Sequence, residues 1–346
     1  MIGRPSEPRA QTAPAPPARR AVRALGLLLS AAILVLVALA SIAIGAKPLS
    51  ADQIWHGLFH GTGTYGDVVV DERLSRTALG LPAGAALGLS GAVLQALTRN
   101  PLADPGLLGI NAGASAAVVT AITYLGVTSL SGYVWFAFVG AAAAGALVWF
   151  LGGGRGTTPV RLALAGAAIS AALYGYLQAV MITDGAALGR MRFWTVGSLA
   201  SASDATVRQV LPFLAVGTVL ALALARPLNA VATGDDTARA LGVNLDRTRA
   251  LAMLAATVLC GAATAACGPI VFVGLLVPHA VRSFTGPDLR WTLPYAALLS
   301  PVLLLGADII GRVVARPAEL QAGIVTAIVG GPVYILLVRR RRTVRL

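Results

Sequence analysis

The sequence predicts an all-α polytopic membrane protein with about ten membrane-spanning helices and both termini in the cytoplasm. Three observations lead to this fold class. The chain is 57% hydrophobic and only 12% charged, whereas a soluble domain carries about 25% charged residues. Uncharged stretches of about 20 residues, the length that crosses the hydrocarbon core of a bilayer, recur along the chain. Lys and Arg gather in alternate connections between these stretches, as they do in cytoplasmic loops.

The individual spans follow from the places where formal charges stop and resume. The uncharged stretch 105–154 is long enough for two helices, which we expect to separate near residues 128–132. The stretch 250–281 is too long for one helix and contains Gly268-Pro269, where proline should end the first helix. The predicted spans are residues 24–46, 77–98, two helices within 105–154, 162–183, 209–225, two helices within 250–281, 291–307 and 320–338.

Two basic tails flank the transmembrane domain, which we place at residues 23–338. Residues 1–22 form a Pro/Ala/Arg-rich cytoplasmic tail and residues 339–346 a second basic one. The first apolar stretch is too long for a cleaved signal peptide, and no small-residue cleavage site stands out before Lys47. With both ends inside, the cytoplasmic segments hold 19 of the 27 Lys and Arg residues. The net charge of +13 therefore reflects membrane orientation, and no nucleic-acid partner is expected.

Two turns are expected at the inner face, after the second and the eighth span. In the first, Pro101 and Pro105 forbid a continuous helix, while Asn100 and Asp104 can cap the helix that follows. At the inner end of the eighth span, His279 follows Pro278 and is expected to cap or contact the second turn. The residues that we single out in these turns are Gln95, Arg99, Asn100, Pro101, Asp104, Pro105, Pro278 and His279.

The loop at residues 227–247, between the sixth and seventh spans, predicts a short amphipathic helix on the inner face. Thr233 and Asp236 have the spacing of a capping box, and Asp235 also suits the positive end of the helix dipole. Gly242 is a natural helix stop. An interfacial connector, common in polytopic proteins, is the alternative. The residues of interest are Thr233, Gly234, Asp235, Asp236, Ala238, Leu241 and Gly242.

The chain carries no pattern for nucleotide binding or catalysis of its own. A nucleotide-binding loop needs a lysine after a glycine-rich turn, but the single lysine, Lys47, lies outside any such loop. His56 and His60 could share a helix face, yet no third ligand is evident, so we expect surface residues and no metal site. Cys260 and Cys267 lie too far apart on one helix for a disulfide and are expected to be buried thiols.

Four ordered sequence blocks resemble the permease family of iron-siderophore, haem and vitamin B12 ABC importers. The first covers residues 73–113, with Gln-x3-Arg-Asn-Pro-Leu-Ala-Asp-Pro at 95–105. The second is Phe-Trp-Thr-Val-Gly-Ser-Leu at 193–199. The third runs from Pro269 to His279 and on to Arg282, and the fourth covers 307–327 with Pro-x-Glu-Leu at 317–320. The sequence departs from the family pattern at Ser75 and Gln321, where proline is usual.

The resemblance implies the permease fold of a type II ABC importer and a set of partners. These are a second permease subunit, either a copy or a relative, two ATP-binding subunits that hold ATP and Mg, and an extracytoplasmic substrate-binding protein. It implies that Arg73, Arg76 and Arg312 receive acidic residues of the binding protein, and that residues 233–242 couple to the ATPase. Arginines at span ends can instead anchor helices in the bilayer, and Asp308 could pair with Arg312.

The resemblance leaves the cargo open among siderophore, haem and corrinoid complexes, with no cofactor on this chain. It places the protein in the bacterial cytoplasmic membrane. An ion-coupled secondary transporter is a rival reading, but it would carry ionisable residues inside its spans, and Asp308 is the main exception here. A membrane-embedded enzyme is disfavoured because clustered catalytic groups are missing.

Overall fold

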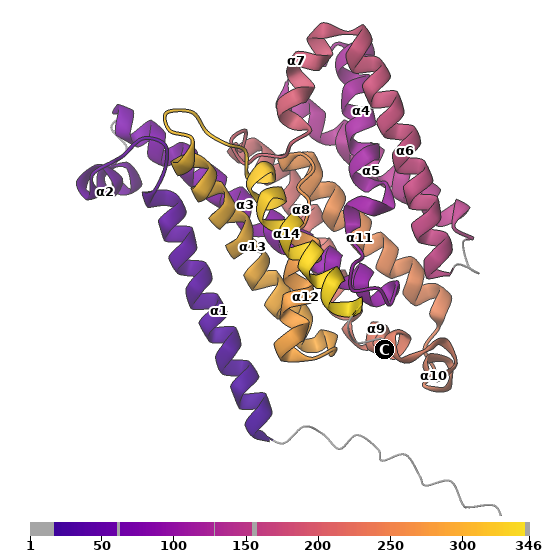
Figure 1. Cartoon of the computed structure of the whole chain (residues 1–346). Helices are drawn as coiled ribbons and strands as arrows, with labels where there is room; N and C mark the ends of the chain where they lie inside the picture. The colour runs from indigo at the N-terminus through magenta and orange to yellow at the C-terminus, as the bar shows by residue number, and fades with distance from the viewer. Residues whose placement is uncertain (1–16, 61–62, 128, 154–157, 343–346) are drawn as a thin grey trace, which may run out of the picture.

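The computed structural model describes residues 17–60, 63–127, 129–153 and 158–342, and every regular element within these ranges is helical (Figure 1). The elements are α1 Pro17–Ala43, α2 Ala51–Phe59, α3 Tyr65–Leu97, η1 Pro105–Leu108, α4 Ile110–Leu125, α5 Leu130–Leu151, α6 Pro159–Thr183, α7 Gly185–Trp194, α8 Asp204–Ala223, α9 Ala225–Thr233, α10 Asp235–Ala240, α11 Leu245–Cys267, α12 Val273–Thr285, α13 Leu289–Val314 and α14 Ala322–Arg342.

The helices confirm the predicted fold class. In the described ranges, seven helices (α1, α3, α5, α6, α8, α11 and α13) are long and apolar enough to cross a membrane. The shorter helices α4, α12 and α14 fall where the three remaining spans were predicted. In Figure 1, α2 and α7 lie at one end of the molecule, and α9 and α10 lie at the other, the end at which α1 starts and α14 finishes. We call these ends the outer and the inner face.

Helices α3 and α11 form the centre of the molecule. In the most apolar window of each, 78% and 72% of the residues are buried, against 11% for α1. Helix α3 packs against α13, α11 and α12, while α11 also packs against α8 and α5. Helix α1 lies at the edge, mainly against α13 (Figure 1). The central pair therefore holds the fold together, whereas most of the α1 surface is left uncovered by the rest of the chain.

Glycine allows the central helices to approach each other closely. A Cβ atom on Gly91 of α3 would collide with the backbone carbonyl of Gly274 in α12. Gly113 of α4 and Gly140 of α5 face each other in the same way. Small residues at helix contacts allow this approach where lipid supplies no hydrophobic drive between helices.

Several predicted spans differ in their bounds from the helices, because the prediction counted uncharged residues only, and the differences at α3 and α13 change the place of key arginines. Helix α3 begins at Tyr65, where Thr64 and Asp67 form a capping box, and not at residue 77. Helix α13 continues to Val314, beyond the predicted end at residue 307. Both helices include arginines that the prediction had placed outside the spans or at their ends.

The predicted tails lie partly outside the described residues. Helix α1 already begins at Pro17, and α14 runs to Arg342, while residues 1–16 and 343–346 are not described.

Candidate functional site

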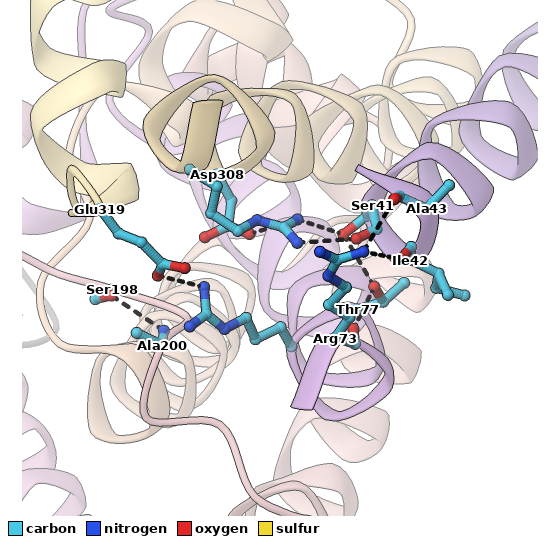
Figure 2. Close-up of polar contacts among 11 residues, drawn as sticks. Ser41, Ile42, Ala43, Arg73, Thr77, Ser198, Ala200, Asp308 and Glu319 are labelled. Atoms are coloured by element: carbon cyan, nitrogen blue, oxygen red, sulfur yellow. Dashed lines mark hydrogen bonds and ion pairs between the residues drawn. The ribbon is translucent and has the colours of Figure 1, made fainter. Parts of the chain in front are cut away.

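At the outer face, Arg73 is folded into the protein at the end of α1. Its guanidinium donates to the carbonyls of Ile42 and Ala43 at 3.0 and 2.9 Å (Figure 2). It also donates to the carbonyl of Lys47 at 2.5 Å. Only 4% of Arg73 is exposed. The last carbonyls of a helix lack partners within it, so Arg73 caps α1 at its C-terminal end.

Arg312 performs the same task from α13. It donates to the carbonyl and the hydroxyl of Ser41, both at 2.9 Å. It also forms an ion pair with Asp308 at 2.9 Å, confirming the predicted pairing, and the two side chains are only 2% and 4% exposed. Thr77 adds a hydrogen bond to the Ser41 hydroxyl at 3.0 Å. The outer end of α1 is thus fixed by charged side chains from α3 and α13, which lie far from it in the sequence.

Arg76 differs from these two arginines because it reaches the surface. Its guanidinium donates to the carboxylate of Glu319 at 2.7 Å, and the two side chains are 12% and 33% exposed. Glu319 lies in the connection between α13 and α14. Of the three arginines predicted to receive a partner, Arg76 is the one on an exposed ion pair, whereas Arg73 and Arg312 are buried and engaged with α1. Docking by any of them stays a prediction.

At the inner face, Asp235 joins two arginines from different helices. Arg249 of α11 lies 2.7 Å from one carboxylate oxygen, and Arg99, just after α3, pairs with the other. Arg99 also donates to the carbonyl of Val231 at 2.9 Å. Partial burial raises the pKa of Asp235, but hydrogen bonds from Arg99 and Arg249 outweigh it, so this pKa lies below its ordinary value. No motif in the sequence indicates a role for Arg249, because its partner is set by the tertiary fold.

The predicted inner helix is present as two short helices, α9 and α10, and its predicted cap is wrong. Gly234, at φ 132°, is the N-cap residue of α10 and no side chain caps that helix. The Thr233 hydroxyl instead donates backward to the carbonyl of Ala230 at 2.7 Å. Gly242, at φ 77°, follows α10 as predicted for a helix stop.

The α9–α10 segment has a buried and an exposed side. Ala238 is fully buried and packs with Val231 and Leu245. Leu241 is 66% exposed, and the side chain of Asp236 is in solvent beside Arg239. The segment is therefore held from within and presents an apolar residue and charges outward.

The first predicted inner turn is tied to the start of α12. Gln95 is buried and its amide donates to the carbonyl of Leu275 at 3.1 Å. Asp104 caps η1, accepting from the Gly106 amide at 2.8 Å. Asn100 does not cap that helix, contrary to prediction, and accepts from the Leu102 amide at 3.0 Å.

Pro101 and Pro105 keep their predicted places, because Pro101 lies in the turn itself and Pro105 opens η1. The prediction for Pro278 and His279 is wrong: both lie within α12, which continues to Thr285, and Pro278 is buried there.

A hollow of about 750 Å³ lies where helices are interrupted within the membrane region. It is bordered by α4, α6 and α14 and by the links that follow α7 and α11. Apolar side chains dominate its wall, with a few polar groups, including Gln178 and Thr195. Irregular backbone at membrane depth is tolerated where it lines such a cavity.

The backbone at this interruption is satisfied by other segments. Helix α11 ends at Cys267, as the Gly268-Pro269 break predicted, and the Ser198 amide donates to the Cys267 carbonyl at 2.7 Å. The Gly323 amide donates to the Gly197 carbonyl at 3.0 Å. The sequence block at 193–199 thus joins α11 to α14. The sequence analysis had marked this block without assigning it to a cavity.

Neither histidines nor cysteines form a metal site in the described part of the chain, where three or more potential ligands nowhere gather. His56 lies 3.4 Å from the carboxylate of Asp67 and stacks on His60. Cys260 and Cys267 are buried free thiols, as predicted.

Known proteins match this chain along most of its length. The family model of the FecCD transport family matches residues 33–340. The ferric enterobactin transport system permease protein FepD of Escherichia coli is 47% identical, over 93% of this chain and 96% of that protein. The Fe(3+)-citrate import system permease protein YfmD of Bacillus subtilis is 39% identical, over 88% and 91%.

A solved structure has the same fold. It is a metal-chelate type ABC transporter in an inward-facing conformation, with a TM-score of 0.79 and 28% identity, and the match covers 93% of this chain and 99% of that one. Because the family match spans nearly the whole transmembrane region, the chain belongs to the FecCD transport family.

Proposed function

We propose that this chain is the membrane-spanning permease subunit of an ABC importer that moves an iron-siderophore complex across the bacterial cytoplasmic membrane. The observation that carries the proposal is the family match over residues 33–340. The relatives named for ferric enterobactin and Fe(3+)-citrate support iron chelates as the cargo. Haem and cobalamin permeases are also related, at 37% and 39% identity, so these cargoes are the alternatives.

A separate ATPase, holding ATP and Mg, is proposed to drive transport through the α9–α10 segment. The exposed Leu241 and Asp236 would contact the ATPase, while buried Ala238 and the Arg99–Asp235–Arg249 bridge hold the segment against the spans. Motion of the ATPase would then reach α3 and α11, the two central helices. Alternating access follows if the ATPase and the binding protein favour different conformations of the permease, one open to the outside and one open to the inside.

A second permease subunit, a copy or a relative, is proposed to cover the open side of the hollow. Tyr174 of α6 and Ile328 of α14 line the hollow and are nevertheless 42% and 64% exposed. Apolar side chains this exposed are suited to a protein interface or to lipid. Two facing hollows would form a mostly apolar pathway wide enough for a large chelate.

The test is ATP-dependent uptake by the importer reconstituted with its ATPase subunits and binding protein. Leu241→Asp should abolish ATPase association and uptake, while Leu241→Met, which keeps an apolar side chain, should preserve both. Ala238→Pro removes the amide that donates to the Gly234 carbonyl at 2.9 Å and should uncouple hydrolysis from uptake.

Uptake that persists without ATP and follows an ion gradient would instead establish the secondary transporter. The ligand bound by the cognate binding protein would decide among siderophore, haem and corrinoid cargo.

A further inference from the structure

Arg76 and Glu319 form a partly exposed ion pair at the outer face, and the role given to it here rests on the proposed importer, whose binding protein would dock at that face. The residues come from elements far apart in the sequence and meet at 2.7 Å. Both side chains are partly exposed, at 12% and 33%. Exposed ion pairs contribute little net stability, because water solvates the separated charges almost as well. Because water reaches Glu319 in particular, this pair can exchange partners at a smaller cost than a fully buried pair.

The neighbouring arginines cannot exchange in the same way. Arg73 donates to two carbonyls at the end of α1 and to the Lys47 carbonyl in the following connection, and Arg312 is paired with buried Asp308 and with Ser41. Releasing either arginine would strand buried polar groups, at a far larger cost than parting an exposed pair. Figure 2 shows Glu319 on the opposite side of the cluster from Ser41 and Arg73.

The position of Glu319 is fixed by its backbone. The adjacent Leu320 amide donates to the Gly311 carbonyl at 3.0 Å, and Arg316 donates to the Gly45 carbonyl at 2.6 Å. Both contacts anchor the connection between α13 and α14, so the Glu319 carboxylate is held over Arg76. Arg76 is thus oriented before any partner arrives.

The surroundings favour a further negative charge. Arg73, Arg76, Arg312 and Arg316 gather around two carboxylates, Asp308 and Glu319, while Asp204 lies nearby and accepts from Ser75 at 3.1 Å. The four arginines outnumber these three carboxylates by one, and a net positive charge attracts an acidic partner. A carboxylate that replaced Glu319 on Arg76 could reproduce its hydrogen bond.

We propose that Glu319 occupies Arg76 as an internal substitute for an acidic side chain of the binding protein, and that this side chain displaces Glu319 when the protein docks. Glu319 keeps Arg76 in its docking orientation and weakens docking by competing for the same guanidinium. The pair thereby limits docking to partners whose own acidic group is well placed.

The experiment measures the affinity of the purified extracytoplasmic binding protein of the same importer for the assembled importer in lipid nanodiscs. Glu319→Gln should tighten binding about twofold to fivefold, the range for loss of one exposed competing ion pair. Glu72→Gln is the matched control, because it removes one exposed negative charge from the outer end of α3. It should change the affinity less. Arg76→Gln should weaken binding.

The three variants separate the two parts of the proposal. If Glu319→Gln binds the binding protein no more tightly than Glu72→Gln does, while Arg76→Gln binds it more weakly, then Glu319 is not a substitute for the partner's acidic side chain, but docking at Arg76 stands. If the affinity of Arg76→Gln is unchanged, both the exchange of carboxylates and docking at Arg76 are wrong. Whether the chain is an importer subunit is tested separately, by ATP-driven uptake. Salt should reduce the gain in Glu319→Gln, since the competing interaction is screened at the surface.

Discussion

Replacing Arg312 by methionine most directly tests whether buried arginines hold the outer end of α1 in place. The substitution removes two hydrogen bonds to Ser41 and leaves Asp308, which is 3% exposed, without its cation. Removing one member of a buried ion pair costs about 3–5 kcal/mol, because the remaining charge is uncompensated. The double variant Arg312→Met/Asp308→Leu removes that charge as well. The double variant should lose only about 1–3 kcal/mol in the free energy of unfolding, which is the cost of a carbonyl left without a donor.

The free energy of unfolding can be measured by reversible denaturation in mixed detergent micelles. Arg316→Met is the matched control, since Arg316 is exposed and donates to the Gly45 carbonyl. Its removal leaves no buried carboxylate without a cation. It should cost about 0.5–1.5 kcal/mol, the usual net value of one hydrogen bond. The reasoning is refuted if Arg312→Met costs no more than Arg316→Met, or if the double variant is no more stable than the single one.

Three further perturbations probe the centre and the inner face. Gly91→Ala should lower the free energy of unfolding by about 1–3 kcal/mol in the same denaturation assay, because the added methyl group meets the backbone of Gly274. Gly175→Ala should cause no such loss, because open space surrounds that position. Asp235→Asn should increase hydrogen exchange of α10 at neutral pH, because the bridge to Arg99 and Arg249 is lost. The pKa of Asp235 is lowered in the folded protein, so the wild-type α10 should lose its protection from exchange once the pH falls below the ordinary pKa of an aspartate. Burial raises the pKa of Asp104 to about 6, so wild type should lose stability as pH rises through that value, and Asp104→Asn should be the more stable protein only above it.

The sequence determined the features that depend on composition and on local backbone chemistry. Too few charges to cover a soluble core and the recurring uncharged stretches specify the spans, since each must fill the hydrocarbon thickness. The break at Gly268-Pro269 and the turn at Pro101 were predictable for an equally local reason, because proline cannot continue a helix.

Spacing alone failed where a local motif competed with the fold. Thr233 and Asp236 have the separation of a capping box, but Gly234 enters α10 at φ 132° and the Thr233 hydroxyl turns back to Ala230. Charge counting failed in the same manner at the start of α3. Its charged outer turn remains helical, because Arg73 finds carbonyl partners on α1.

Only the tertiary structure decided what the charged side chains do. The sequence marks Arg73, Arg76 and Arg312 as one group at the outer face, yet two cap α1 and one pairs with Glu319. Apart from Asp308, which lies one helical turn from Arg312, the partners of these arginines lie between 26 and 271 residues away along the chain. No periodicity or spacing encodes such a contact, because it exists only once α1, α3 and α13 have packed. The hollow beside α6 and α14 arises in the same way, from interrupted helices brought together by the fold.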